Sequence, residues 1–366
     1  MEQPTHLVYV GTYTSFEPDA RGRAEGIYTY RLNPDTGELS FVAVTGDVPN
    51  PSFLTVHPDR STLYAANEVT EIDDHPGGAV SAFAIDRESG ALTFLNRQPS
   101  HGTDPCHVSV ERDGGSVFVA NYTSGSIAVL PIEDTGRLAP ATDTRQHKGS
   151  GPNPDRQEGP HAHFIVPDPS NRFVLAVDLG LDKVLVYRFD AERGVLTEHD
   201  PPSAPLPPGS GPRHLAFHPD APYIYVINEL ASTISTCAWD ASAGTLQVLD
   251  TISTLPDGFD GKNSCAEVRV SPSGRFVYGS NRGHNSIAVF AIDEQHGTLI
   301  PTGHVSTEGR NPRNFTIDPA GRFMLVANHD TDTIVTFRID EETGDLTPTG
   351  HVTTVPSPVC VTIMPE

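Results

Sequence analysis

The chain has 366 residues, and its 47 Asp and Glu against 24 Lys and Arg give a formal net charge of −23 with histidine neutral. Such an acidic chain repels phosphodiester backbones and anionic lipids, which argues against nucleic-acid or membrane-surface binding as its main function. With 37% hydrophobic and 19% charged residues, the composition is typical of a globular protein and too apolar for a disordered one.

The N-terminal segment, residues 1–12, has neither the basic region nor the apolar region of a secretory signal, so we expect a cytoplasmic protein. No run approaches the ~18 apolar residues that a membrane span needs. The four cysteines are far apart and have no C-x-x-C spacing, so we expect buried, reduced thiols rather than a zinc site or a disulfide framework. They are Cys106, Cys237, Cys265 and Cys360.

A sequence unit repeats about every fifty residues. Each copy contains four short alternating or β-branched runs separated by Pro-Asp, Ser-Gly, Asn-containing and Thr-Gly turns, the pattern of a four-stranded antiparallel meander. Successive starts are separated by 54, 55, 52, 52 and 48 residues. The starts are Pro51, Pro105, Pro160, Pro212, Ser264 and Pro312.

Counting each strand type separately gives seven copies of the second, third and fourth strands. The second strands are predicted at residues 7–11, 62–67, 116–121, 172–178, 223–228, 275–281 and 322–328. The third strands run from residues 26–32 to residues 332–339, and each fourth strand follows a glycine. The first strand has no copy before residue 6, and its seventh copy is found at residues 358–365.

This displacement predicts an all-β, seven-bladed β-propeller with four antiparallel strands per blade, formed by one domain over residues 1–366. The C-terminal strand would complete the first blade and close the ring, which removes unprotected sheet edges. A linear solenoid would instead carry capping units at both ends.

Antiparallel pairing places the start of each first strand on the same face as the end of its second strand. This face is predicted to be rich in ionisable residues and to contain three arginines, which would form a local anion site in an otherwise acidic chain. Three joining segments, 139–159, 198–211 and 253–263, are expected to reach the same face. The ionisable or amide residues expected there are His107, His161, Arg213, His214 and Arg313 from strand starts, and Asn67, Glu68, Asn121, Asp178, Asn228, Glu229, Asn281, Arg282, Asn328 and His329 from strand ends.

Several of these segments resemble one known family, the seven-bladed propeller lactonases, which includes the propeller-type 6-phosphogluconolactonases and a fungal muconate lactonizing enzyme. The segments are Gly159-Pro-His-Ala-His, Gly211-Pro-Arg-His-Leu-Ala-Phe-His-Pro, Val226-Ile-Asn-Glu-Leu, Ser280-Asn-Arg and Asn311-Pro-Arg-Asn-Phe. The resemblance covers essentially the whole chain. It implies hydrolysis of a sugar-acid lactone, most specifically 6-phosphogluconolactone, in carbohydrate metabolism. It also implies that the catalytic and anion-binding group is His161, Arg213, Glu229 and Arg282.

Opening a lactone requires an activated water, stabilisation of the tetrahedral oxyanion and a grip on the anionic part of the substrate. Either His161 or Glu229 is therefore the hypothetical general base, and Arg213 and Arg282 would offset the developing charge. Arg313 together with Lys262 would hold a phosphate. His163 and His214 complete the predicted substrate-binding group, and no metal or cofactor is expected.

Each of these residues also has a plainer interpretation. Arg213 and Glu229 form a structural ion pair if they only join adjacent strands, and His161 is then a hydrogen-bonded channel residue. His161 and His163 have the spacing of a His-x-His metal site, but no third ligand has motif-level spacing. His214 is alternatively a local packing residue. The recurring Asn67, Asn121 and Asn328 favour a role in locking the blades.

Two other functions stay open. The chain would be an unphosphorylated-sugar lactonase or a muconate-type cycloisomerase if the anion site accepts another carboxylate. It would be a non-catalytic binding platform if aromatic side chains surrounded the mouth instead. For the lactonase we expect a small anionic lactone as the partner, no nucleic acid or membrane, and a monomer or weak homodimer.

Overall fold

The structure is a computed structural model that describes residues 6–14, 23–73 and 75–364. Residues 1–5 of the N-terminal segment and Pro365 of the predicted last strand lie outside these ranges. In the described ranges the only helix is a short 3-10 turn, η1 (His329–Thr331). No helix in this part of the chain is long and apolar enough to cross a membrane.

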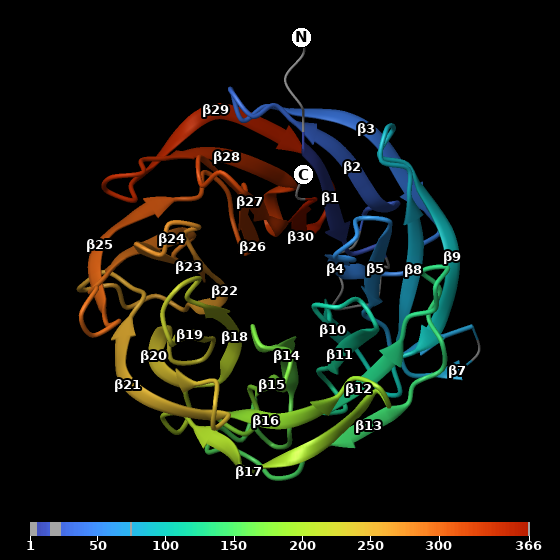
Figure 1. Cartoon of the computed structure of the whole chain (residues 1–366). Helices are drawn as coiled ribbons and strands as arrows, with labels where there is room; N and C mark the ends of the chain where they lie inside the picture. Colours follow the sequence, from blue (N-terminus) through green and yellow to red (C-terminus); the bar gives the residue numbers. More distant parts are fainter. Residues whose placement is uncertain (1–5, 15–22, 74, 365–366) are drawn as a thin grey trace. The chain divides into compact units, whose positions relative to one another are not determined.

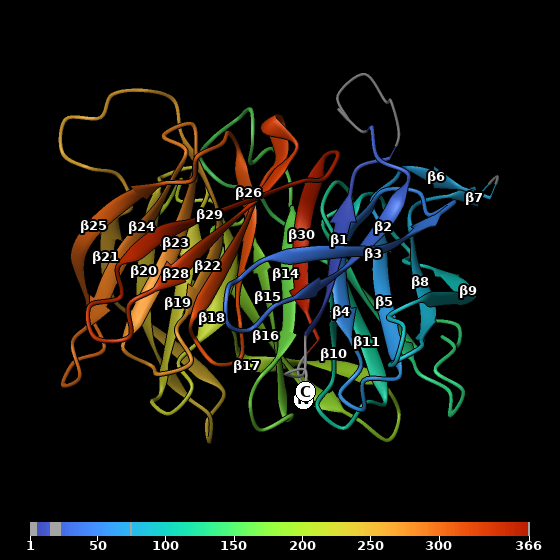
Figure 2. The same cartoon turned by 90° about the horizontal axis from the view of Figure 1, so that it is seen from above.

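The strands form seven four-stranded antiparallel sheets and one two-stranded ribbon (Figure 1). The first sheet contains β30 (Pro358–Ile363), β1 (His6–Thr12), β2 (Gly26–Leu32) and β3 (Leu39–Gly46). The second contains β4 (Pro51–Val56), β5 (Thr62–Asn67), β8 (Ala79–Ile85) and β9 (Leu92–Pro99). The ribbon of β6 (Glu71–Ile72) and β7 (His75–Pro76) extends from one end of this second sheet (Figure 2).

The remaining five sheets each use four consecutive strands. The third has β10 (Pro105–Val110), β11 (Ser116–Asn121), β12 (Ser126–Pro131) and β13 (Asp143–Gln146). The fourth has β14 (Ala162–Pro167), β15 (Phe173–Asp178), β16 (Lys183–Asp190) and β17 (Val195–Pro205). The fifth has β18 (Pro212–Phe217), β19 (Tyr223–Asn228), β20 (Thr233–Asp240) and β21 (Thr245–Ser253). The sixth has β22 (Ser264–Val270), β23 (Phe276–Arg282), β24 (Ser286–Ile292) and β25 (Leu299–Ser306), and the seventh has β26 (Pro312–Ile317), β27 (Phe323–Asn328), β28 (Thr333–Ile339) and β29 (Leu346–Thr354).

The described chain groups into two compact units. Unit 1 comprises residues 1–44, 213–239 and 247–366, and unit 2 comprises residues 45–212 and 240–246. Each unit contains buried hydrophobic clusters of its own, one around Val8 and Val361 in unit 1 and one around Phe118 and Ile165 in unit 2. The single domain over residues 1–366 stays a prediction.

The first sheet is completed by the C-terminal strand, as the repeat predicts. β30 pairs antiparallel with β1, and Val10 lies opposite Val361 (Figure 1). Val8, Val10 and Val361 belong to one buried cluster, so this pairing is supported by side-chain packing as well as by backbone hydrogen bonds.

The first strand of a sheet carries one extra residue near its start, a β-bulge that redirects side chains. The register shifts between Pro51 and Phe53 in β4 and between Pro312 and Asn314 in β26. The same shift occurs in β10, β14 and β22. The residue after the first paired position, such as Arg313, therefore does not follow the regular alternation of side chains between the two faces of the sheet.

An asparagine at the end of a second strand ties its sheet to the segment that precedes it in sequence. The Nδ2 group of Asn67 donates to the Pro49 carbonyl at 2.7 Å, and that of Asn328 donates to the Thr307 carbonyl at 3.0 Å. Asn121 makes the equivalent bond in the third sheet. These contacts agree with the blade-locking interpretation of the recurring asparagines.

Two sequence expectations are wrong in register. The fourth repeat starts at Ala162 rather than Pro160, because Ala162 pairs with Asp178 as Pro51 pairs with Asn67. His161 therefore precedes its strand. Residues 198–205 continue β17 and do not form a joining loop, because their backbone pairs with β16 as far as Lys183 opposite Pro205.

Removing β30 tests the closure of the first sheet. Truncation after Ser357 exposes the edge of β1 and the buried faces of Val8 and Val10, so we expect the apparent melting temperature to fall by more than about 5 °C, with loss of cooperativity. Truncation after Met364 is the matched control and should leave the transition unchanged. Differential scanning calorimetry measures both, and equal melting curves would contradict the closure.

Candidate active site

Unit 1 brings together three of the predicted residues in a nearly buried ion cluster. Arg213 is the second residue of β18, Glu229 follows the end of β19, and Arg282 is the last residue of β23. The Oε2 atom of Glu229 lies 3.1 Å from Arg213 Nε and 2.7 Å from Arg282 Nη2. The exposed fractions of these three side chains are 3% for Arg213, 7% for Glu229 and 15% for Arg282. One carboxylate therefore pairs with two guanidinium groups and leaves a net positive charge, and Arg282 is the more accessible of the two arginines.

The backbone of β22 holds both arginines from the other side. Arg213 Nη1 donates to the Ala266 carbonyl at 2.8 Å, and Arg282 Nη2 donates to the Cys265 carbonyl at 2.8 Å. These carbonyls belong to the stretch of β22 where the register shifts, between Cys265 and Val268. The bulge thus turns two successive carbonyl groups into acceptors for the cluster.

The cluster is dominated by positive charge. Burial lowers the pKa of Arg213 to about 10, and the nearby Arg282 and Arg313 lower it as well, whereas Glu229 and Glu267 raise it. Arg213 still carries its charge at neutral pH, because this pKa lies well above 7. An anion arriving at the cluster would relieve the repulsion among the three guanidinium groups.

Arg313 has a partner that the sequence did not reveal. Its Nη2 group donates to the Tyr13 hydroxyl at 2.8 Å, and its guanidinium carbon lies 5.5 Å from the centre of the Tyr13 ring. Tyr13 follows the last residue of β1, the repeat position that Tyr122 and Glu229 occupy after β11 and β19, so the strand-end position itself was the signal that could have found it. A hydrogen bond and a cation–π contact together orient Arg313.

His214 lies beneath Arg213 rather than at an open surface. It is 1% exposed, its Nε2 atom lies 3.2 Å from Arg213 Nη1, and its Nδ1 atom lies 3.2 Å from Glu267 Oε2. Burial holds the pKa of His214 well below its usual range, and Arg213 is the next largest cause. The geometry favours a contact with Arg213 over the predicted contact with substrate. Glu267, which is 1% exposed, was missed because it lies one residue beyond the position occupied by Arg213 and Arg313.

Lys262 has an exposed side chain in the segment between β21 and β22. The backbone carbonyl of Lys262 lies against Gly283, which follows Arg282 and has a φ of +128°. A Cβ atom at residue 283 would collide with this carbonyl, so only glycine allows the segment to approach the end of β23 so closely. This contact brings the Lys262 backbone near Arg282, and its phosphate-binding role stays a prediction.

The predicted histidines His161 and His163 lie in unit 2, and both of their rings contact Tyr122. The His161 ring stacks on Tyr122 with 4.6 Å between ring centres, its Nδ1 atom lies 3.1 Å from the Tyr122 carbonyl oxygen, and its Nε2 atom lies 3.1 Å from Glu158 Oε1. A carbonyl oxygen only accepts, so Nδ1 carries a proton; the Glu158 carboxylate also only accepts, so Nε2 presents a lone pair only when Glu158 has moved away. Glu158 is 60% exposed, and its own backbone amide is the main cause that lowers its pKa, with His161 and Arg156 adding to this effect.

His163 Nδ1 lies 3.6 Å from the Cys106 thiol, and both residues are buried. Across the described ranges, no three His, Cys, Asp or Glu side chains are grouped to hold a metal ion. The four cysteines are free and buried, as predicted.

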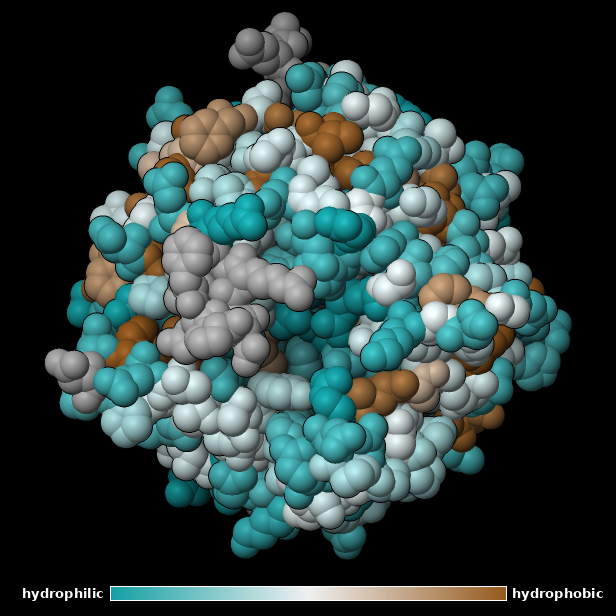
Figure 3. Space-filling view, turned by 180° about the vertical axis from the view of Figure 1, so that it is seen from behind, coloured by the Kyte–Doolittle hydropathy of each residue, from teal (hydrophilic) through white to brown (hydrophobic). Residues whose placement is uncertain are grey.

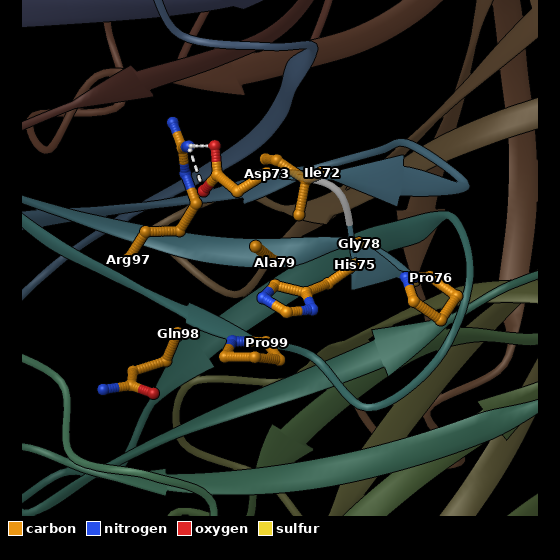
Figure 4. A pocket seen from close by; sticks show the side chains of 10 residues that line it. Ile72, Asp73, His75, Pro76, Gly78, Ala79, Arg97, Gln98 and Pro99 are labelled. Carbon is orange, nitrogen blue, oxygen red and sulfur yellow. Dashed lines mark hydrogen bonds and ion pairs between the residues drawn. The ribbon is translucent and has the colours of Figure 1, made fainter.

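A pocket of about 340 Å³ in unit 2 lies away from the predicted residues of that unit. It is lined by the β6–β7 ribbon and by residues 97–99 at the end of β9, and an ion pair between Arg97 and Asp73 crosses one side of it at 3.1 Å (Figure 4). Neither His161 nor His163 lines it. It is therefore not the predicted site.

Comparison with known proteins places the chain in a family. The family described as Lactonase, 7-bladed beta-propeller, matches residues 7–363. The chain belongs to the seven-bladed β-propeller lactonases. A 6-phosphogluconolactonase of Bacillus subtilis is 39% identical over 313 residues, which cover 86% of this chain and 85% of the relative. A 6-phosphogluconolactonase of Formosa agariphila is 34% identical over 316 residues, which cover 85% and 86%.

A solved structure supports the same family. The periplasmic gluconolactonase PpgL of Pseudomonas aeruginosa is 35% identical, with a TM-score of 0.91 and coverage of 99% of both chains. The comparisons thus confirm two predictions made from the sequence, the seven-bladed propeller fold and a lactonase. The roles of individual site residues stay predictions.

Removing the shared carboxylate tests how strongly the cluster depends on it. Glu229→Ala leaves Arg213 buried without its counter-ion, so we expect the free energy of unfolding to fall by about 3–5 kcal/mol. Chemical denaturation measures this change.

The matched control is Asp190→Ala, because Asp190 pairs with Arg193 at 4.0 Å on the surface, where the two side chains are 44% and 75% exposed. Loss of such a pair costs about 0–1 kcal/mol. Equal losses in the two variants would show that the Glu229 cluster does not stabilise the lactonase.

Proposed function

We propose that this lactonase hydrolyses 6-phosphogluconolactone to 6-phosphogluconate. The observation that carries the proposal is the cluster of Arg213, Glu229 and Arg282, with Arg313 close enough to lower the Arg213 pKa. A lactone with an anionic tail needs positive charge at two places, the carbonyl oxygen and the tail, and this group of arginines supplies both. The curated relatives named as 6-phosphogluconolactonases support the same substrate.

In the proposed mechanism, water attacks the lactone carbonyl carbon and the C=O electron pair moves onto oxygen. Arg213 and Arg282 stabilise this oxyanion. The Nε group of Arg282 is buried and has no hydrogen-bond partner among the described residues, so it is available to donate to it. The electron pair then returns, the ring C–O bond breaks, and the ring oxygen takes a proton to become the product hydroxyl.

Two groups are candidates to accept the proton of the attacking water. Glu229 Oε2 already forms ion pairs with two guanidinium groups, which stabilises its ionised form and makes it a weak base. This arrangement favours Glu229 as the residue that orients the arginines. The partner of His161 Nε2 is the carboxylate of Glu158. This side chain is exposed and is therefore easily displaced. We therefore assign the base role to His161.

The phosphate is assigned to Arg313, oriented by Tyr13, with Lys262 as the second cation. Hydrolysis of 6-phosphogluconolactone and of unphosphorylated gluconolactone, followed as acid release, tests this assignment. Arg313→Ala should raise the KM for the phosphorylated lactone about 10- to 100-fold, because a charge-assisted contact of about 1.5–3 kcal/mol is lost. The KM for the unphosphorylated lactone is the internal control and should stay within about threefold. An equal rise for both lactones would contradict phosphate binding by Arg313.

His161→Ala tests the base assignment. Removing a positioned general base should lower kcat about 10²- to 10⁴-fold, with a smaller change in KM. His57→Ala is the matched control, because His57 lies in a His-Pro turn of the same unit and its Nε2 atom bonds only the Gly114 carbonyl in this structure. Near-wild-type kcat in His161→Ala would assign the base to another group.

An unphosphorylated sugar lactone is the second candidate substrate, because the PpgL neighbour is named a periplasmic gluconolactonase. The same pair of lactones separates the two: a higher kcat/KM for the unphosphorylated lactone favours this alternative. A muconate-type cycloisomerase would be inactive on both. The cytoplasmic location stays a prediction, since PpgL is named as periplasmic. The monomer or weak homodimer stays a prediction as well.

A protein-binding platform is less well supported. The large hydrophobic residues that are exposed in the described chain all lie on the fourth strands of their sheets, whereas the residues of the ion cluster come from the first and second strands. They are Phe41, Phe94, Leu249, Ile300 and Val352. On the face seen in Figure 3, hydrophobic side chains are scattered among a majority of hydrophilic ones.

A further inference from the structure

The third residue of the first strands differs in character between the two units. We count from the residue opposite the terminal Asn or Asp of the second strand. In unit 2 this position holds Phe53, His107 and Phe164, whose rings contact one another at 4.2 Å and 3.9 Å between centres. In unit 1 the equivalent residues of β18, β22 and β26 are His214, Glu267 and Asn314.

The unit 1 residues form a hydrogen-bonded row instead of an aromatic one. Glu267 Oε2 lies 3.2 Å from His214 Nδ1 and accepts a hydrogen bond from Asn314 Nδ2. The Asn314 Oδ1 atom accepts from the backbone amide of Val361 at 2.9 Å. The row therefore runs from the residue after Arg213 to the residue after Arg313 and ends on the C-terminal strand.

Glu267 is costly to bury, and the fold does not require it. A buried carboxylate is tolerated only when it is paired, and here the Val268 amide and Arg269 Nε, at 3.2 and 3.3 Å, join His214 and Asn314 as its partners. Aromatic rings fill the same strand position in unit 2 without a buried charge. Filling space therefore does not explain why unit 1 has the polar row.

The chemistry of the row fixes Arg213. A carboxylate only accepts hydrogen bonds, so His214 Nδ1 carries the proton and His214 Nε2 presents a lone pair. That lone pair accepts from Arg213 Nη1 at 3.2 Å, while Glu229 lies against Arg213 Nε and the Ala266 carbonyl accepts from Nη1. The guanidinium group is thereby held at both its Nε and its Nη1 atoms.

We propose that Glu267 and His214 are positioning residues: Glu267 fixes the tautomer of His214, and His214 orients the Arg213 guanidinium for the anionic substrate. This inference rests on the proposed function. We assign neither residue a contact with the substrate, because both ring nitrogens of His214 are engaged by Arg213 and Glu267, and Glu267 lies beyond His214 from Arg213.

The decisive comparison is His214→Phe against His107→Phe. Both variants replace a buried histidine at the same strand position with an aromatic residue, which that position accepts in β4 and β14. We expect His214→Phe to lower kcat/KM for 6-phosphogluconolactone by about 30-fold or more, and His107→Phe to change it by less than about threefold. Thermal unfolding is measured in parallel, and we expect the larger shift in His214→Phe, because it also removes a partner of the buried Glu267.

A double-mutant cycle separates positioning from general destabilisation. If His214 acts through Arg213, adding His214→Phe to Arg213→Lys should lower kcat/KM by less than about threefold, although it costs about 30-fold in the wild type. Glu267→Gln keeps the shape and an acceptor for His214 Nδ1, so it should restore most of the activity that Glu267→Ala loses. A purely structural role would give additive losses and no such rescue.

Binding of 6-phosphogluconate, measured by calorimetry, keeps the inference separate from the proposed reaction. Weaker binding in His214→Phe by about tenfold or more, with unchanged binding in His107→Phe, supports positioning even if no lactone is hydrolysed, in which case only the proposed function fails. Equal binding and equal kcat/KM in the two variants would overturn the inference while leaving the function intact. Failure of the wild type to bind the anion would overturn the inference as well.

Discussion

One oxygen of Glu229 contacts two guanidinium groups in a nearly dry environment, and much of unit 1 is arranged around this contact. Removing three charged groups from water is expensive, and a single carboxylate does not repay the cost for two arginines. The carbonyls of Cys265 and Ala266 supply the missing acceptors. They are available only because β22 departs from regular pairing at this point, so the irregularity of the strand and the charge of the site depend on each other.

The acidic composition and the arginine cluster act over different distances. Exposed carboxylates are screened within about 10 Å in physiological salt, so an anionic lactone is not kept away from the protein by its net charge of −23. Guanidinium groups that are nearly buried are screened much less. Selection of an anion therefore depends on the final approach to Arg213, Arg282 and Arg313, where three positive groups meet one neutralising Glu229 and the deeper Glu267.

The fold was predictable to within a residue or two at most second strands, because a fifty-residue period repeats the same turns and alternation. Because the first strand of the first repeat is found at the C-terminus, the sequence predicted that β30 pairs with β1. The pairing of Arg213 with Glu229 also followed from the antiparallel geometry. The register of His161 did not, because two alternative residues, Pro160 and Ala162, fit the start of the repeat and only backbone pairing separates them. Tyr13 and Glu267 were missed for different reasons: Tyr13 occupies the strand-end position of Glu229 but is an uncharged residue, and the bulge conceals which face a residue such as Glu267 occupies.

The first sheet combines strands from both ends of the chain, and this affects folding during synthesis. β1, β2 and β3 leave the ribosome hundreds of residues before β30, so during synthesis the backbone groups of β1 that β30 will occupy have no native partner. An unpaired strand edge with Val8 and Val10 beside it is a template for association with other chains. The nascent chain is therefore exposed to misassembly until its final segment appears, and Tyr13, which follows β1, cannot be held firmly beside Arg313 before then.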